Sequence, residues 1–287
     1  TFTKNLVVAE PIKLTKKHLK QSNHMAQVLV VNSGNANACT GEQGREGAEQ
    51  MAHAAAEEFK VDVNAVLVTS TGIIGKAFPT DEVVQGIRDN AKNISENSRA
   101  GSFCANAILT TDTFAKEGFV EFELDGNTVN IGGIAKGSGM IHPNMGTMLA
   151  FVFTDINIDQ KLLDKAFKEA VNDSFNMITV DGDTSTNDMA CIMANGLAGN
   201  EEVTELDDPH YATFKEKLNE ILVHLAKLIV SDGEGASKFI EYHLHGAKTK
   251  KDARQLIRTV SDSSLVKTAM FGRDPNWGRI LAAMGRS

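Results

Sequence analysis

Residues 132–151 read GGIAKGSGMIHPNMGTMLAF, and this stretch joins a glycine-rich segment to an apolar one. Its first half is rich in glycine and carries one cation, Lys136, where the backbone can approach a ligand closely. Its second half becomes an apolar run, Met148 to Phe153, which is typical of a buried strand. A hydroxyl residue, Thr147, stands at the boundary directly after the small Gly146. A nucleophile could lie there, although a threonine that opens a strand more often serves β propensity.

A resemblance to a known family lies in residues 136–149, KGSGMIHPNMGTML. They closely resemble the self-cleavage segment of the glutamate N-acetyltransferase / ornithine acetyltransferase family. In that family the peptide bond before the threonine breaks autocatalytically, and the freed threonine becomes an N-terminal nucleophile. The resemblance therefore implies cleavage between Gly146 and Thr147, with Thr147 as the nucleophile. The family more often has alanine before the threonine, and Gly146 is a small, compatible departure.

Composition limits the class of protein. Of the 287 residues, 42% are hydrophobic and 23% are charged, which is typical of an ordinary globular protein of one large domain or two packed ones. A net charge of −8 argues against nucleic acid or an anionic membrane as partner. The sequence shows neither a membrane-spanning apolar stretch nor a signal-peptide pattern, so we expect a cytoplasmic location. Cys39, Cys104 and Cys191 have small or apolar neighbours and no CxxC spacing, which predicts reduced, buried thiols.

Cleavage would divide the chain into two fragments. The resemblance implies an α fragment, residues 1–146, and a β fragment, residues 147–287, that begins with the nucleophile. Chains of the family usually extend further at both ends. We therefore expect the β fragment to be truncated at its C-terminus, with the family's C-terminal substrate-binding residues beyond Ser287.

Two strand ends in the first third of the chain are candidates for the site. Residues 27–31 predict a strand that runs into NSGNANACTG, a loop that can satisfy its own backbone and is also a specific signature of the family. A helix is predicted over 42–59. Residues 65–68 predict a second strand, which is followed by TSTGIIG. This segment brings backbone N–H groups and hydroxyls to one point, as an oxyanion hole requires. A tight turn without any catalytic role would use the same residues. The resemblance implies that Thr71 and Gly72 stabilise the oxyanion.

The middle of the α fragment predicts a further helix, a strand and a hairpin. The helix begins at Thr80. Residues 103–109 predict a strand that leads to Thr-Thr-Asp-Thr, where the resemblance implies a substrate contact by Thr110, with Thr111 close behind. Alternating residues on both sides of Asp125–Gly126 predict the hairpin.

Carboxylates and helices organise the β fragment. Asp159 predicts the cap of an amphipathic helix. Residues 180–188, VDGDTSTND, superficially suggest a divalent-cation loop, but we favour a hydrogen-bonded loop. The same phrase occurs in the family, whose reaction needs no metal, so no metal site is predicted. Strong helical periodicity follows over 211–229, before Glu234, which resembles the family's substrate-binding glutamate.

The C-terminal part adds a helix and a second family motif. The helix is predicted over 253–260. Residues 274–279, DPNWGR, again match the family. Arg273 and Arg279 beside this motif could serve folding or an anionic ligand, and the sequence does not decide between them.

These elements indicate a mixed α/β (α+β) protein. The resemblance implies a helix–sheet–sheet–helix sandwich, shared with certain self-processing aminopeptidases. It also implies transfer of an acetyl group from N2-acetylornithine to glutamate by a ping-pong mechanism through acetyl-Thr147. Lys136 would hold a substrate carboxylate and Glu234 a substrate ammonium. We expect no cofactor, with acetyl-CoA as an open co-substrate, and an α2β2 heterotetramer of the two fragments.

Two other classes of protein remain open from the sequence. A self-processing amidase or aminopeptidase of the same fold would release its acyl group to water. A non-catalytic fragment or binding protein would not form an acyl-enzyme.

Overall fold

The computed structural model describes residues 1–142 and 148–287, except for the side chain of Ser98. Gly146 and Thr147, the predicted cleavage pair, therefore lie outside the described residues. The strands are β1 (Val28–Asn35), β2 (Val66–Ile73), β3 (Lys116–Leu124), β4 (Asn127–Lys136), β5 (Leu149–Thr154) and β6 (Met189–Ala194). The helices are α1 (Glu10–Gln21), α2 (Gly41–Phe59), α3 (Thr80–Ala91), α4 (Ser98–Ala107), α5 (Gln160–Asp173), α6 (Pro209–Ser231), α7 (Lys250–Ser261), α8 (Ser264–Phe271) and α9 (Trp277–Met284).

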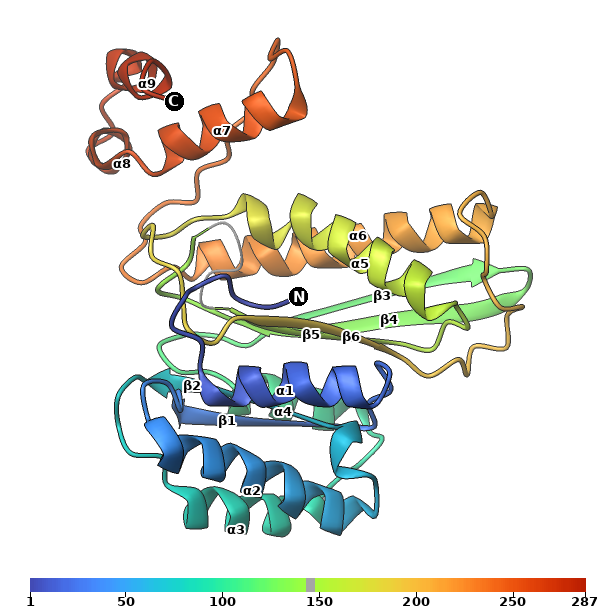
Figure 1. The fold of residues 1–287 in the computed structure, drawn as a ribbon. Coiled ribbons are helices and arrows are strands. Elements are labelled where there is room, and N and C mark those ends of the chain that lie inside the picture. The colour runs from blue at the N-terminus through green and yellow to red at the C-terminus, as the bar shows by residue number, and fades with distance from the viewer. Residues whose placement is uncertain (143–147) are drawn as a thin grey trace.

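Two sheets lie in layers between helices (Figure 1). Helices α5 and α6 cover one face of the larger sheet, the smaller sheet lies beyond its other face with α1 beside it, and α2 and α3 close the far side. Buried Val152, Phe214 and Leu222 belong to the core between the larger sheet and its helices. Leu67 of β2 and Phe151 of β5 share a second core between the sheets. This arrangement confirms the predicted helix–sheet–sheet–helix sandwich.

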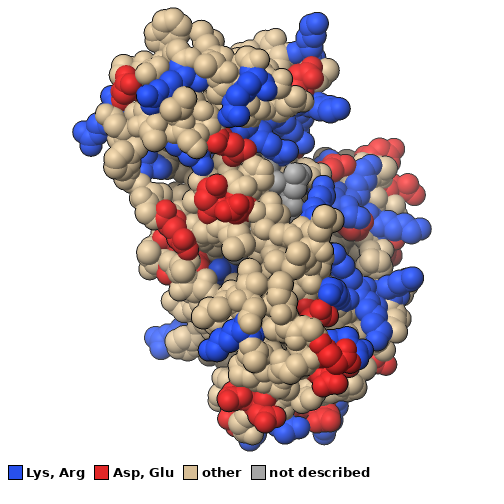
Figure 2. All heavy atoms as spheres, turned by 60° about the vertical axis from the view of Figure 1, so that its left-hand side comes forward, with Lys and Arg blue, Asp and Glu red and all other residues tan. Residues whose placement is uncertain are grey.

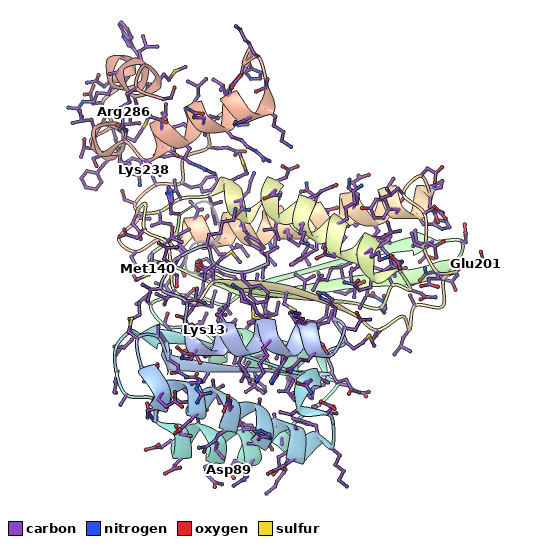
Figure 3. All side chains as sticks on the ribbon, in the orientation of Figure 1. Lys13, Asp89, Met140, Glu201, Lys238 and Arg286 are labelled. Atoms are coloured by element: carbon purple, nitrogen blue, oxygen red, sulfur yellow. The ribbon has the colours of Figure 1, made fainter. Side chains whose placement is uncertain are left out.

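The strand order brings several strand ends together. The larger sheet runs β3-β4-β5-β6 and the smaller one pairs β1 with β2 in parallel. In the larger sheet Lys136 lies opposite Leu149, and Leu149 lies opposite Met189. The last residue of β4 and the first residues of β5 and β6 are therefore neighbours at one end of the sheet. Figure 3 shows Met140 at that end, and Glu201 at the opposite one.

The predicted hairpin is confirmed, because β3 and β4 pair antiparallel with Leu124 opposite Asn127. Asp125 and Gly126 between them have φ of 49° and 81°. A two-residue turn with both φ values positive matches the right-handed twist of a hairpin, and aspartate followed by glycine is a favoured pair there.

The strand predicted over residues 103–109 is wrong, because helix α4 occupies most of this segment. The side chain of Asn97 accepts a hydrogen bond from the Ala100 amide and so caps the helix. Ala105 is fully buried while Phe103 is 72% exposed, so the apolar residues do not form one buried strand. A short apolar run does not by itself distinguish a strand from a helix.

Helix α1 was not predicted, although it is tied closely to β2. The Thr15 hydroxyl donates to the Val68 carbonyl at 2.6 Å and accepts from the Val68 amide at 2.8 Å. His18 Nδ1 lies 2.8 Å from the Val66 carbonyl. These polar contacts, rather than an apolar stripe alone, hold α1 beside the smaller sheet.

The C-terminal helices form a separate small cluster above α5 and α6 in Figure 1. Helix α7 confirms the prediction over 253–260, and α8 and α9 follow it. The core of this C-terminal cluster is formed by Val260, Val266 and Ala283. The Lys267 ammonium donates to the Val180 carbonyl at 2.7 Å and so connects the cluster to the rest of the molecule.

Acidic and basic side chains share the face of the molecule drawn in Figure 2, where they are interspersed. Within residues 1–142 and 148–287, every helix is too short or too polar to cross a membrane. Cys39 and Cys104 are exposed and Cys191 is half-buried, so the predicted burial is wrong for the first two, while all three are free thiols as expected. The exposure of Cys104 follows from its position on a helix instead of a buried strand.

Candidate functional site

The fold gathers three of the predicted site residues around one ammonium group. Lys136 ends β4, Thr71 lies near the end of β2, and Thr110 follows α4. Lys136 Nζ donates to Thr110 Oγ1 at 2.8 Å and to Thr71 Oγ1 at 3.4 Å. Because an ammonium only donates, both hydroxyl oxygens accept, and their hydrogens stay available to a substrate oxygen.

Asp112 is the third partner of Lys136. Its Oδ2 atom lies 3.6 Å from Nζ, and both side chains are almost fully buried. Burial lowers the pKa of Lys136, and the Asp112 carboxylate opposes that shift. A substrate carboxylate at Lys136 would therefore compete with Asp112 and Thr71, the two more distant partners of the ammonium.

Lys116 and Asp232 complete a buried charge network that the sequence did not reveal. Lys116 Nζ lies 2.8 Å from Asp112 Oδ1 and 2.7 Å from Asp232 Oδ2, and the Lys116 side chain is 0% exposed. The amide of Thr113 donates to Asp232 Oδ2 at 2.9 Å, and its hydroxyl also donates to this carboxylate. Asp112, Lys116, Lys136 and Asp232 are called the charge network below.

The network keeps its carboxylates ionised. Burial by itself raises the pKa of Asp112, but the Lys136 charge, the Lys116 hydrogen bond and the Gly137 amide together lower it below its usual value. The pKa of Asp232 is also lowered, because its bonds to Lys116 and Thr113 outweigh its desolvation. Two cations thus face two anions in the interior.

Glu234 lies against the glycine-rich segment that follows Lys136. A Cβ atom at Gly139 would come within 2.5 Å of Glu234 Cδ, so the exposed carboxylate lies directly against this glycine. The Glu234 amide donates to the Ser138 carbonyl at 2.9 Å, and the Ser138 hydroxyl donates to the Asp232 carbonyl at 2.7 Å. The backbone of residues 137–139 therefore connects the buried ammonium of Lys136 to the exposed carboxylate of Glu234.

Gly72 requires glycine for two reasons. Its φ is +131°, and an added Cβ atom would lie 2.3 Å from the backbone carbon of Gly34. The backbones of β1 and β2 are therefore in close contact beside Thr71, which is buried. The structure confirms the tight strand end that was predicted here, and the oxyanion role of Thr71 and Gly72 stays a prediction.

The loop over residues 180–188 is hydrogen-bonded, as we favoured. Its last residues are buried, and Asn187 Nδ2 donates to the Ala36 carbonyl at 2.6 Å and the Ser70 carbonyl at 2.8 Å. Asp181 Oδ2 accepts from the Met140 amide at 2.5 Å. Among the described residues, His, Cys, Asp and Glu side chains do not gather in threes suited to a metal ion.

Arg279 serves folding in this structure. Its Nη1 atom donates to the Leu265 carbonyl at 2.9 Å and to Thr268 Oγ1 at 3.1 Å, which ties α9 to α8. Arg273 has a positive φ of 56° between these helices. The contacts of Arg279 support the folding alternative for this residue.

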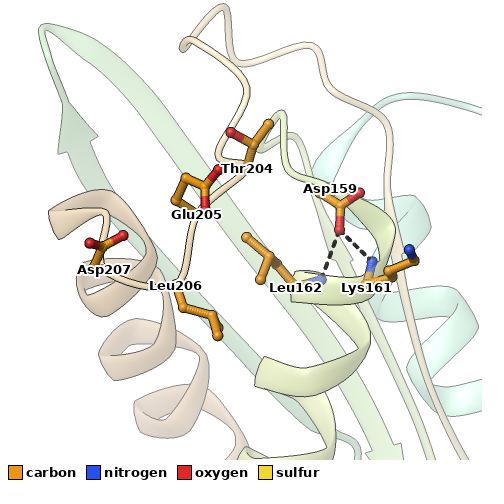
Figure 4. Close-up of a pocket in the computed structure, with 7 residues that line it drawn as sticks. All are labelled: Asp159, Lys161, Leu162, Thr204, Glu205, Leu206 and Asp207. Atoms are coloured by element: carbon orange, nitrogen blue, oxygen red, sulfur yellow. Dashed lines mark hydrogen bonds between the residues drawn. The ribbon is translucent and has the colours of Figure 1, made fainter.

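A hollow elsewhere on the molecule is lined by Asp159, Lys161, Leu162 and residues 204–207 (Figure 4). Its one carboxylate with a defined role is Asp159, which accepts from the Lys161 and Leu162 amides at 2.9 and 3.2 Å. These bonds confirm Asp159 as the predicted cap of α5. The predicted site residues lie elsewhere, around Lys136.

Known proteins resemble the whole of this chain. The model of the ArgJ family matches residues 1–287. The arginine biosynthesis bifunctional protein ArgJ of Symbiobacterium thermophilum is 52% identical over 286 residues, which is 100% of this chain and 70% of the relative. ArgJ 1 of Clostridium acetobutylicum is 50% identical over 287 residues, 100% of this chain and 69% of the relative. The crystal structure of argJ from Bacillus halodurans has 42% identity and a TM-score of 0.46, and covers 50% of this chain and 73% of that one.

Proposed function

The chain belongs to the ArgJ family, and from that premise we propose that it transfers an acetyl group from N2-acetylornithine to glutamate through acetyl-Thr147. It is an acyltransferase of arginine biosynthesis that acts on small-molecule substrates, as its family implies. The observation that carries the detailed proposal is the convergence of Thr71, Thr110 and Lys136 from three separate elements.

The nucleophile is the hydroxyl of Thr147, and it needs a base. A threonine hydroxyl is weakly nucleophilic at its own pKa. Self-cleavage between Gly146 and Thr147 frees the α-amine of Thr147, and an amine with a pKa of about 8 can accept the hydroxyl proton at neutral pH. The freed β fragment, residues 147–287, then remains bound to the α fragment, residues 1–146.

The described residues supply the rest of the reaction. Hydrogen-bond donors of Thr71 and Gly72 stabilise the oxyanion that forms on the acetyl carbonyl. Lys136 and Thr110 hold the polar groups of the substrate, and Glu234, which is exposed, holds its ammonium. Ornithine leaves, and glutamate then removes the acetyl group from Thr147.

Three finer points are part of the same proposal. The two fragments assemble as an α2β2 heterotetramer, and the enzyme works in the cytoplasm. It uses no cofactor. Acetyl-CoA is a second acetyl donor, because a nucleophile that accepts acetyl from an amide can accept it from a more reactive thioester.

The experiment that tests this proposal is detection of the covalent intermediate in the full-length protein. N-acetylornithine without glutamate should add one acetyl mass to the fragment that begins at Thr147, and glutamate should remove it as N-acetylglutamate. Double-reciprocal plots should be parallel. The Thr147→Ala variant should stay uncleaved and unlabelled.

The alternatives give different results in the same experiment. A self-processing amidase would lose the label to water at the same rate with or without glutamate. A binding protein would never gain it. If the double-reciprocal plots intersect and rapid quench detects no acetylated Thr147, the acetyl group passes directly from donor to acceptor and the proposed covalent mechanism is wrong.

A further inference from the structure

One buried carboxylate, that of Asp112, contacts several of the groups from which the site is built. Its Oδ2 atom accepts from the Thr110 amide at 3.2 Å and lies 3.6 Å from Lys136 Nζ. Its Oδ1 atom accepts from the Gly137 amide at 2.7 Å and from Lys116 Nζ at 2.8 Å. The Asp112 side chain is 0% exposed, so it acts on a substrate through these neighbours.

The contacts of Oδ2 close a ring with Thr110 and Lys136. Asp112 holds the backbone of Thr110, the Thr110 hydroxyl accepts from Lys136 Nζ at 2.8 Å, and Nζ faces Asp112 again. Thr110 itself is exposed. Since its oxygen accepts from the ammonium, its hydroxyl hydrogen is left for another acceptor. The ring therefore presents one hydroxyl and one ammonium together at an accessible edge.

The contacts of Oδ1 fix the carboxylate independently of that ring. The Gly137 amide directly follows Lys136 in the chain, so Asp112 holds Lys136 through its backbone as well as through its charge. Lys116 is itself bonded to Asp232 at 2.7 Å. Of the four contacts of Asp112, the one with Lys136 is the longest. A substrate carboxylate can therefore displace it while the other three keep Asp112 in place.

Asp112 is also the counter-charge of Lys136. Of the carboxylates that the structure describes, it is the one in ion-pair contact with this ammonium. The other charged or titratable groups that face Lys136 are Lys116, Glu234 and Asp188. Lys116 is a like charge, Glu234 is exposed, and the raised pKa of Asp188 weakens it as an anion. Burial lowers the pKa of Lys136, and Asp112 is the largest influence against that shift.

We propose that Asp112 is a positioning residue, which holds Thr110 and Lys136 in the arrangement that receives the substrate and supplies the counter-charge of Lys136. This role rests on the substrate contacts of Thr110 and Lys136 proposed above. Without Asp112, Thr110 would lose the bond that holds its backbone, and Lys136 would remain buried beside Lys116, a group of like charge.

The first test is the pH dependence of kcat/KM for N-acetylornithine in the full-length protein, which reports groups of the free enzyme. In the wild type, kcat/KM should fall as the pH rises through the lowered pKa of Lys136, because the ammonium then loses its charge. Asp112→Asn removes the counter-charge, so this fall should begin at least about 1 pH unit lower. Ionisation of the substrate ammonium is common to both proteins and cannot produce the difference.

A matched control is Asp155→Asn. Asp155 also binds the backbone of β4, since it accepts from the Asn130 amide at 2.8 Å towards the other end of the strand. It should therefore disturb the sheet without moving the alkaline fall. A shift as large as that of Asp112→Asn would show that disturbance of β4, rather than the charge of Asp112, sets the profile, and would overturn the proposal.

Asp112→Glu separates position from charge, and it keeps the ion pairs on which folding depends. Its oxygens are displaced by one methylene, so kcat/KM should fall by about 10–100-fold, as for a misplacement of about 1 Å. The pH of the alkaline fall should stay near that of the wild type. This variant also tests the proposal if Asp112→Asn does not fold.

Two sets of outcomes distinguish this role from the proposed function. An alkaline fall at the same pH in the wild type and Asp112→Asn, or full activity of Asp112→Glu, would overturn the role of Asp112 and leave the transferase in place. A wild type that falls only with the substrate ammonium would overturn the substrate contact of Lys136, and the inference with it. A full-length wild type that transfers no acetyl group would overturn the proposed function itself.

Discussion

Asp112 and Asp188 are both buried aspartates near Lys136, and the pKa values of their carboxyl groups are shifted in opposite directions. Asp112 is bonded to Lys116 and the Gly137 amide and faces Lys136, and its pKa is lowered. Asp188 has one amide partner and an unpaired oxygen, and its pKa is raised. Burial is the largest influence on both pKa values, and it raises both. The number of charged and hydrogen-bonding partners therefore decides the direction in which the pKa of each carboxyl is shifted.

The largest effect should come from breaking the charge network at Lys116. Lys116→Met would leave Asp232 without its cation and Asp112 with only the more distant Lys136. Removing one partner of a buried ion pair costs roughly 3–5 kcal/mol of stability. We expect a loss of that size in the free energy of unfolding, measured by urea titration. A loss below about 1 kcal/mol, as for an exposed pair, would show that the network is not stabilised in this way.

A smaller effect on folding, with a specific effect on substrate, is expected at Lys136. After Lys136→Met, Asp112 keeps its 2.8 Å bond to Lys116, so the variant should unfold less readily than Lys116→Met. Loss of a charged hydrogen bond to substrate should weaken its binding by roughly 1.5–3 kcal/mol. The Michaelis constant for N-acetylornithine measures this change. An unchanged Michaelis constant with a collapsed melting temperature would make Lys136 purely structural.

The opposite pKa shifts predict opposite dependences of stability on pH. The contribution of Asp112 is present above its unfolded pKa and is lost as the pH falls through its lowered folded pKa. That of Asp188 is present below its unfolded pKa and is lost as the pH rises towards its raised folded pKa. Each contributes at most about 1.4 kcal/mol per pH unit within its own range. Unfolding titrations of Asp188→Asn from pH 4 to 8 should therefore lack the loss that the wild type shows.

The smallest effect is expected from an exposed aspartate of the same loop as Asp188. Asp183→Asn should change the free energy of unfolding by less than about 0.5 kcal/mol, since surface substitutions usually do. Its side chain is exposed, and no described hydrogen bond uses its carboxylate. A change as large as that of Asp188→Asn would mean that the loop as a whole, and not the buried carboxyl, determines the response.

Local chemistry explains which elements could be predicted. The Asp125–Gly126 turn and the apolar periodicity of α6 are encoded by neighbouring residues, and both predictions are confirmed. Helix α4 was mistaken for a strand because a short apolar run fits both structures, and its cap, Asn97, lies outside that run. Helix α1 was not predicted, and polar Thr15 and His18 share its buried face with apolar Ile12 and Leu14.

The site was predicted only where a motif named its residues. Thr71, Thr110 and Lys136 came from the resemblance, and the structure brings them together. The charge network could not be predicted, because Lys116 and Asp232 are 116 residues apart and meet only in the folded protein. Asp188 was visible as one carboxylate of an acidic loop. Its burial, which separates it from the exposed Asp181 and Asp183, depends on tertiary packing.

The pairing of β4 with β5 has a consequence for how such an enzyme can be made. Six residue pairs, from Ile131 opposite Thr154 to Lys136 opposite Leu149, join strands on opposite sides of the predicted cleavage bond. If each fragment were translated from its own message, each would expose an open strand edge, and such edges promote aggregation. Synthesis as one chain supplies β4 and β5 in equal number, and the two strands pair before the chain is cut. The precursor would thus act as an internal chaperone for the two-chain enzyme, and separately expressed fragments should fail to reconstitute it.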